Sequence, residues 1–235
     1  MSFIITVYTN EGIIMASDSR TTYTTTETDA DGSKIIKQGT QITDSTYKTF
    51  MCNKRIGLST CGDASINNMP IAGFIDEFIM DNVTDDTSVE DVATAVLKYF
   101  SNFNPIPNTR FIIAGYDKDN KQHISRVYVG TSQNTVIATD VPGVIWDGEV
   151  DILKRLIKNI GVKLADGTYE DQPKFTIDFN YFTLQDAVDF AEYAVDVTIK
   201  TMAFQSRVKT VGGPIDILAI KPSGAFWVKR KELHA

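Results

Sequence analysis

The order of the apolar patterns along the chain is the feature that most limits how it can fold. Runs rich in β-branched residues come first, and two amphipathic helical patterns follow them. Further strands, two more helical patterns and two final strands complete the chain. No linker-like composition separates these groups, so each helix pair is expected to pack on a sheet. We therefore predict an α+β fold, a four-layer αββα sandwich of two antiparallel sheets between helix pairs.

The predicted elements have the following bounds. Strands are expected over 3–8, 13–17, 41–52, 55–61, 110–116, 122–129, 135–139, 215–220 and 225–229, and helices over 65–80, from Ser88, over 148–160 and over 184–204. Pro70 predicts that the first helix is kinked or starts close to that residue. The runs 21–26 and 35–38 predict a polar β-hairpin arm that turns at Asp31-Gly32. The stretch 164–180 has no regular period and predicts irregular structure.

The second residue of the chain carries a hydroxyl group, and a strand, a tight turn and a second strand follow it. Removal of Met1 would leave Ser2 with that hydroxyl and a free α-amine on one residue. An α-amine has a pKa of about 8, so it can act as a general base near neutral pH. Nucleophile and base would then belong to the same residue, which is one recognised way to activate a weak hydroxyl nucleophile.

Composition argues against several classes of function. The chain has 235 residues, 43% of them hydrophobic, which is enough for one sizeable core. A net charge of −7 argues against nucleic acid and anionic membranes as partners. No apolar run is long enough to cross a bilayer, and the start lacks the basic and apolar regions of a signal peptide. These features predict a cytoplasmic protein.

The cysteines and histidines argue against other kinds of site. Cys52 and Cys61 are expected to be reduced, buried, small apolar residues. Cysteines and histidines do not cluster at zinc-ligand spacings, and neither a metal nor a cofactor is predicted. His123 and His234 are the two histidines, one in a polar hairpin and one near the C-terminus. A His-dependent catalytic triad is therefore not expected.

Three segments together resemble the N-terminal nucleophile (Ntn) hydrolases of the proteasome β-subunit and HslV family. The stretch 10–20, ending in Ser17-Asp18-Ser19-Arg20, is similar to the family's opening NGVVLAADSR. Residues 47–50 and 56–64 resemble the strand with the active-site lysine and the glycine-containing segment after it, and 111–117 resembles the central strand and its GYD turn. The divergent bacterial Anbu and betaproteobacterial homologue types look closer than any eukaryotic subunit.

Spacing supports this resemblance, which implies a set of roles. Ser2 lies sixteen residues before Asp18, and Lys48 lies fourteen before Gly62, as in the family. The resemblance implies that Ser2 is the nucleophile in place of the usual Thr, with its α-amine as base. Lys48 would lower the pKa of the Ser2 hydroxyl by its charge, or accept its proton if desolvated. Asp18 would orient Lys48, the backbone N–H near Gly62 would stabilise an oxyanion, and Arg20 would be a structural partner.

The chain departs from the family near its C-terminus. The family carries an Asp and a Ser before a Gly-Gly pair, and these two side chains brace the terminal amine. Gly212-Gly213 is present here, but Val208 and Val211 stand at the bracing positions. Asp147 is our candidate for a replacement acceptor of the amine. The run 21–41 is longer than in typical members, so we expect a hairpin insertion there within a single domain of residues 1–235.

The leading hypothesis is a proteasome-like peptidase that cleaves amide bonds in peptides or unfolded proteins. The resemblance implies a homo-oligomer, either a ring or a helical stack, and leaves an ATP-dependent unfoldase open as a partner. Two alternatives remain at this point. One is an amidase that acts on a small molecule with the same Ser2 chemistry. The other is a catalytically inactive scaffold or shell subunit with the same fold.

Overall fold

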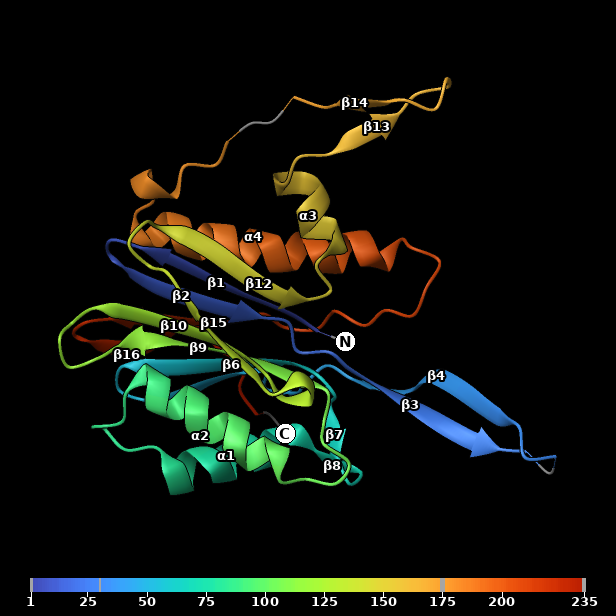
Figure 1. The fold of residues 1–235 in the computed structure, drawn as a ribbon, viewed down its shortest axis with the longest axis horizontal. Helices are drawn as coiled ribbons and strands as arrows, with labels where there is room; N and C mark the ends of the chain where they lie inside the picture. The colour runs from blue at the N-terminus through green and yellow to red at the C-terminus, as the bar shows by residue number, and fades with distance from the viewer. Residues whose placement is uncertain (1, 30, 174–175, 234–235) are drawn as a thin grey trace.

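Two five-stranded antiparallel sheets form the centre of the structure, a computed structural model that describes residues 2–29, 31–173 and 176–233. The sheets lie face to face (Figure 1). The first has the strand order β12 (Gly143–Gly148), β1 (Phe3–Thr9), β2 (Gly12–Ser17), β15 (Asp216–Lys221), β16 (Gly224–Lys229). The second has the order β11 (Gln133–Ile137), β10 (Gln122–Tyr128), β9 (Thr109–Tyr116), β6 (Ile56–Gly62), β5 (Thr49–Asn53). The predicted mixed α and β class is confirmed.

Helices cover the outer face of each sheet. Helices α3 (Asp151–Ile157) and α4 (Leu184–Ala203) lie over the first sheet, and α1 (Ile71–Asn82) and α2 (Val89–Ser101) lie over the second (Figure 1). Capping boxes fix two of the helix starts, because Ser88 and Thr183 each accept a backbone N–H and are met by an Asp three residues later. No helix in the described ranges is long and apolar enough to cross a membrane.

Strand β1 is buried on both faces and connects two cores. Ile4 and Tyr8 pack between the two sheets, in a cluster that also contains residues of β2, β9 and β15. Phe3, Ile5 and Val7 point the other way, against α3 and α4. Each side chain of this size contributes about 1.5–3 kcal/mol when it is fully buried. The position of residue 2 is therefore set by a strand that is held from both sides.

A long hairpin projects from the body of the protein (Figure 1). It consists of β3 (Thr21–Thr28) and β4 (Lys34–Thr43), so the pairing extends beyond the predicted end at Gln41. Ile36 and Ile42 on this arm are 63% and 47% exposed. The smaller elements are the strands β7 (Ser65–Ile66), β8 (Met69–Pro70), β13 (Gly161–Lys163) and β14 (Tyr169–Asp171) and the 3₁₀ turns η1 (Val129–Thr131) and η2 (Phe179–Tyr181).

Several predicted boundaries are wrong. The helix predicted over 65–80 does not include 65–70 and begins at Ile71, which confirms the prediction that it starts close to Pro70. Pro70 is its N-cap, and left-handed Asn67 and Asn68 turn the β7–β8 hairpin before it. The strand predicted over 41–52 is divided between the end of β4 and β5. The helix predicted over 148–160 is α3 alone, and the irregular stretch 164–180 contains β14 and η2. Strand β12 was not predicted.

Candidate active site

Ser2 lies at the entry to β1 and is 7% exposed. Its carbonyl oxygen accepts a hydrogen bond from the Glu149 backbone N–H at 2.8 Å. Gly148, which stands opposite Phe3 in the β1–β12 register, has φ +91°, and a Cβ on it would lie 1.9 Å from the Ser2 oxygen. Only glycine fits this close approach. Met1 lies outside the described residues, as does His234.

Asp18 is fully buried and gathers four hydrogen-bond donors. Its Oδ1 accepts from Lys48 Nζ at 2.8 Å and from the Phe3 backbone N–H at 3.0 Å. Its Oδ2 accepts from the backbone N–H groups of Arg20 at 3.1 Å and Gly212 at 3.0 Å. One carboxylate thus holds together the start of β1, the end of β2, the Gly212 loop and the lysine.

Lys48 is an ammonium group placed in the protein interior, with its side chain 3% exposed. Besides Asp18, its Nζ donates to the carbonyl oxygen of Arg20. Burial lowers the pKa of Lys48, and the attraction of Asp18 opposes part of that decrease, while the charge of Lys231 lowers the pKa further. Lys48 therefore releases its proton more readily than an exposed lysine does.

Ser2, Lys48 and Gly62 line one narrow pocket, which Thr21 and Cys61 also border. Its free volume is about 10 Å³, roughly the room for one water molecule. The structure thus brings together the predicted nucleophile, the predicted lysine and the predicted oxyanion segment. Cys61 is buried, which raises its thiol pKa, and burial raises the pKa of Cys52 to about 12. Both are free thiols, as predicted.

Gly62 holds the end of β6 in a conformation that glycine adopts most easily. Its φ is +112°, and a Cβ at this position would lie 2.3 Å from the carbonyl oxygen of Asn108. The next residue, Asp63, donates its backbone N–H to the same oxygen at 3.2 Å. The backbone beside the Ser2 pocket is therefore fixed by close contact with the loop that precedes β9.

A Gly62→Ala variant is expected to lose about 2–4 kcal/mol of unfolding free energy, because the new Cβ adds both a clash and backbone strain. Gly73→Ala is the matched control. Gly73 lies in α1 with open space around its Cβ position. Alanine there is expected to leave the free energy of unfolding unchanged or to increase it by about 0.5–1 kcal/mol. Urea denaturation of the two variants measures both effects. A Gly62→Ala variant as stable as wild type would contradict the prediction.

Arg20 lies beside this site and contacts the loop that carries Gly212. Its Nε and one terminal nitrogen donate to the two carboxylate oxygens of Asp44 at 2.6 and 2.7 Å. A Cβ on Gly212 would lie 2.6 Å from the guanidinium carbon, so the backbone passes directly against the Arg20 head group. Arg20 thus packs against the backbone of Gly212, whose N–H donates to Asp18.

Asp147, the predicted acceptor of the Ser2 amine, is buried at the end of β12 and accepts hydrogen bonds from two other groups. Its Oδ1 accepts from Arg110 at 2.7 Å and from the backbone N–H of Gly148 at 2.8 Å. The guanidinium of Arg110 also lies 5.2 Å from the centre of the Tyr128 ring. Bracing of the Ser2 amine by Asp147 stays a prediction.

A second buried ion pair lies close to the first and was not predicted. Lys231 contacts Asp216, whose Oδ1 also accepts from the Lys231 backbone N–H at 2.8 Å. Asp216 stands opposite Ser17 in the β2–β15 register, one residue from Asp18. Lys231 Nζ lies 4.2 Å from the centre of the Tyr47 ring, next to Lys48. Burial lowers the pKa of Lys231, and Asp216 opposes that change.

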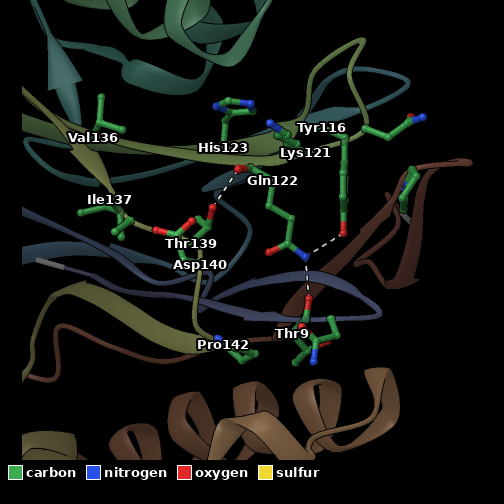
Figure 2. Close-up of a pocket in the computed structure, with 14 residues that line it drawn as sticks. Thr9, Tyr116, Lys121, Gln122, His123, Val136, Ile137, Thr139, Asp140 and Pro142 are labelled. Carbon is green, nitrogen blue, oxygen red and sulfur yellow. Dashed lines mark hydrogen bonds between the residues drawn. The ribbon is translucent and has the colours of Figure 1, made fainter.

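Another cavity, of about 500 Å³, is far from these residues. It lies at the Thr9 end of β1 (Figure 2), roughly 20 Å along the strand from Ser2. Gln122 spans it by donating to the Thr9 carbonyl oxygen and to the Tyr116 hydroxyl (Figure 2). His123 lines the same cavity, with its Nε2 3.5 Å from an Asp117 carboxylate oxygen. We place the candidate chemistry at Ser2, where the predicted nucleophile, the predicted lysine and the predicted oxyanion segment meet.

Comparison with known proteins shows which solved structures share the fold of this chain. Neither a family model nor a curated protein matches the sequence. Among solved structures, an Anbu (Gly-1) mutant from Hyphomicrobium sp. strain MC1 superposes with a TM-score of 0.61 at 18% identity, covering 98% of this chain and 86% of that one. Anbu from the same strain gives 0.59 at 17%, covering 97% and 86%. Anbu (ancestral beta-subunit) from Yersinia bercovieri gives 0.63 at 16%, covering 96% and 87%. The resemblance seen in the sequence is confirmed at the level of the fold, and this chain has the fold of the Anbu proteins.

Proposed function

We propose that this chain is a proteasome-like Ntn hydrolase, a four-layer αββα sandwich that cleaves amide bonds in peptides or unfolded proteins. Ser2 is the nucleophile once Met1 has been removed. The observation that carries the proposal is the shared pocket of Ser2, Lys48 and Gly62, beside the buried ion pair of Lys48 with Asp18. The proposal places the enzyme in the cytoplasm, where a methionine aminopeptidase can expose Ser2.

The proposed reaction proceeds through an acyl-enzyme. The Ser2 hydroxyl gives its proton to its own α-amine or to Lys48, and its oxygen attacks the substrate carbonyl carbon. The carbonyl oxygen becomes an oxyanion, which a backbone N–H near Gly62 stabilises. When the intermediate collapses, the C–N bond breaks, the amine leaves with the proton, and an ester on Ser2 remains. Water then hydrolyses the ester and restores the hydroxyl.

Lys48 suits either role that this reaction asks of it. As a cation, it lowers the pKa of a neighbouring hydroxyl. Because burial lowers its pKa, Lys48 is more often the neutral amine near neutral pH than a lysine in water is, and only the neutral amine can accept a proton. Asp18 keeps the side chain in place in both states, because three backbone N–H groups fix the carboxylate independently of the lysine.

We also propose that the chain assembles with copies of itself. Exposed apolar residues on both projecting hairpins support this, since exposed apolar surface is a common feature of protein–protein contacts. Ile36 on β4 is 63% exposed, and Val162 and Tyr169 on the β13–β14 hairpin are 47% and 71% exposed. A ring or helical stack would enclose the active sites. An unfoldase partner stays a prediction.

A covalent probe tests the proposal directly. We expect a β-lactone or vinyl sulfone to label the purified full-length protein once per chain, with the label mapping to Ser2 by peptide mass spectrometry. The labelled chain should have the mass of the chain without Met1 plus one label, and a Ser2→Ala variant should stay unlabelled. Native mass spectrometry of the same sample gives the number of subunits, and a monomer at micromolar concentration would contradict the assembly proposal.

Three outcomes separate the alternatives. A chain that keeps Met1 and takes no label would favour the inactive scaffold. Labelling of Ser2 without cleavage of any peptide, but with turnover of small amides, would favour the small-molecule amidase. Labelling at a residue other than Ser2 would overturn the assignment of the nucleophile.

A further inference from the structure

A second pocket, here called the basic pocket, lies near Ser2 at the end of β12. Its volume is about 400 Å³, and residues of β9, β10, β12 and α3 surround it. One carboxylate, Asp147, is among its lining residues, together with four cationic side chains: Arg110, Arg126, Lys154 and Lys158. Such a concentration of positive charge contrasts with the net charge of −7 of the whole chain.

Most of this positive charge has no counter-ion. Arg110 is paired with Asp147 at 2.7 Å. Within the part of the chain that the structure describes, no carboxylate forms a recorded ion pair with Arg126, Lys154 or Lys158. Arg126 donates one terminal N–H to the Trp146 carbonyl oxygen at 3.3 Å. Its Nε is buried and has no hydrogen-bond acceptor among the described residues. Lys158 Nζ lies 5.4 Å from the centre of the Trp146 ring.

An arrangement of this kind is unfavourable unless an anion completes it. Like charges that line one cleft repel each other, and a buried N–H without an acceptor costs free energy. Neither effect helps the fold, and an anion bound among these side chains would relieve both. A carboxylate accepts hydrogen bonds from the guanidinium fork of an arginine in its own plane, and lysines beside it add point charges. The donors of the basic pocket match such a group.

The basic pocket adjoins the candidate active site through two direct connections. Gly148 lines the basic pocket and stands opposite Phe3, and the next residue, Glu149, holds the Ser2 carbonyl oxygen. Arg110 lines the basic pocket and pairs across strands with Cys61, which lines the pocket of Ser2. The two pockets are therefore neighbours in the structure.

We propose that the basic pocket binds a carboxylate side chain of the peptide substrate, so that the enzyme prefers peptides with Asp or Glu near the cleaved bond. This inference rests on the proposed function for the role of Ser2. The binding site itself depends only on the four cations and the pocket that they line.

Calorimetric titration of the full chain carrying Ser2→Ala tests binding without turnover. Two capped five-residue peptides serve as probes, one with a central Glu and one with Gln in its place. We expect the Glu peptide to bind about tenfold more tightly, as for a charge-assisted hydrogen bond, and to weaken as salt increases. Lys158→Gln and Arg126→Gln, each added to this background, should reduce the preference to less than about twofold.

The matched control is Arg155→Gln in the same background. Arg155 is an exposed residue of α3 outside the basic pocket, and its replacement removes the same charge. The preference for Glu should survive this change. Equal binding of the two peptides, or equal loss of preference in all three variants, would overturn the inference. Binding of inorganic phosphate without a Glu preference would also overturn it, and would identify a different anion site.

Hydrolysis by the chain with Ser2 intact separates this inference from the proposed function. If Glu is preferred in binding but neither peptide is cleaved, the carboxylate site stands and the peptidase proposal fails. If both peptides are cleaved with equal kcat/KM and bound with equal affinity, the peptidase stands and the carboxylate site fails. Thermal melting of each variant confirms that the comparison is made between folded proteins.

Discussion

A Ser2→Ala variant is expected to lose at least about 10³-fold in the rate of peptide hydrolysis while keeping the melting temperature of the wild type. The alanine removes the hydroxyl oxygen that forms the acyl-enzyme in the proposed reaction. It keeps the α-amine, the backbone contact with Glu149 and the side-chain volume to within one atom. The kcat of the two proteins on a fluorogenic peptide measures the loss, and native mass spectrometry checks that the variant has the same number of subunits as the wild type.

Ser2→Thr is the matched control for this experiment. Threonine keeps the hydroxyl and the α-amine, and its methyl group restricts χ1. We expect activity within about tenfold of the wild type. Hydrolysis by Ser2→Ala at the wild-type rate would exclude Ser2 as the nucleophile, whatever the threonine variant does.

An Asp18→Asn variant is expected to lose about 3–5 kcal/mol of unfolding free energy at pH 7, because it leaves a buried ammonium without its counter-ion. Asp44→Asn is the control. It breaks the pair with Arg20 at a site where the Asp44 side chain is 43% exposed, and solvent screening reduces that loss to about 0–1 kcal/mol. Chemical denaturation at pH 7 gives both values.

The loss in Asp18→Asn is also expected to depend on pH. Asp18 raises the pKa of Lys48 against the larger effect of burial, so removing its charge lowers that pKa further. In the variant, Lys48 is protonated in the unfolded chain but not in the folded chain over a wider pH range than in the wild type. This difference in proton binding destabilises the folded variant. The penalty disappears as pH rises toward the ordinary lysine pKa, about 10.4. The stability gap should therefore narrow between pH 7 and pH 9.5, and a constant gap would contradict this account.

The parts of the site that the sequence predicted depend on short-range structure. Ser2 and Asp18 belong to one hairpin, β1–β2, and Lys48 and Gly62 flank another, β5–β6. The lengths of the two hairpins fix the spacing of these residues, so motif spacing was informative. Stacking of the two sheets then brings the hairpins together, and the element order had already suggested that stacking.

The missed features depend on contacts between distant segments. Strand β12 pairs with β1, and nothing in its local sequence identifies that partner. Lys231 stands in a basic run near the C-terminus that resembles a solvated tail. It is buried because the tail follows β16 back to Asp216 and Tyr47. Likewise, Arg110 and Arg126 look like ordinary strand residues in the sequence. Only the fold shows that β12 and α3 form the basic pocket with them.

The wide separation in sequence of the donors to Asp18 has a consequence for synthesis of the protein. The donors come from residues 3, 20, 48 and 212, so the hydrogen bonds to Asp18 are complete only when nearly the whole chain has left the ribosome. A nascent or truncated chain lacks the loop that carries Gly212. The proposed hydrolytic activity therefore requires that almost the whole chain has been synthesised and folded.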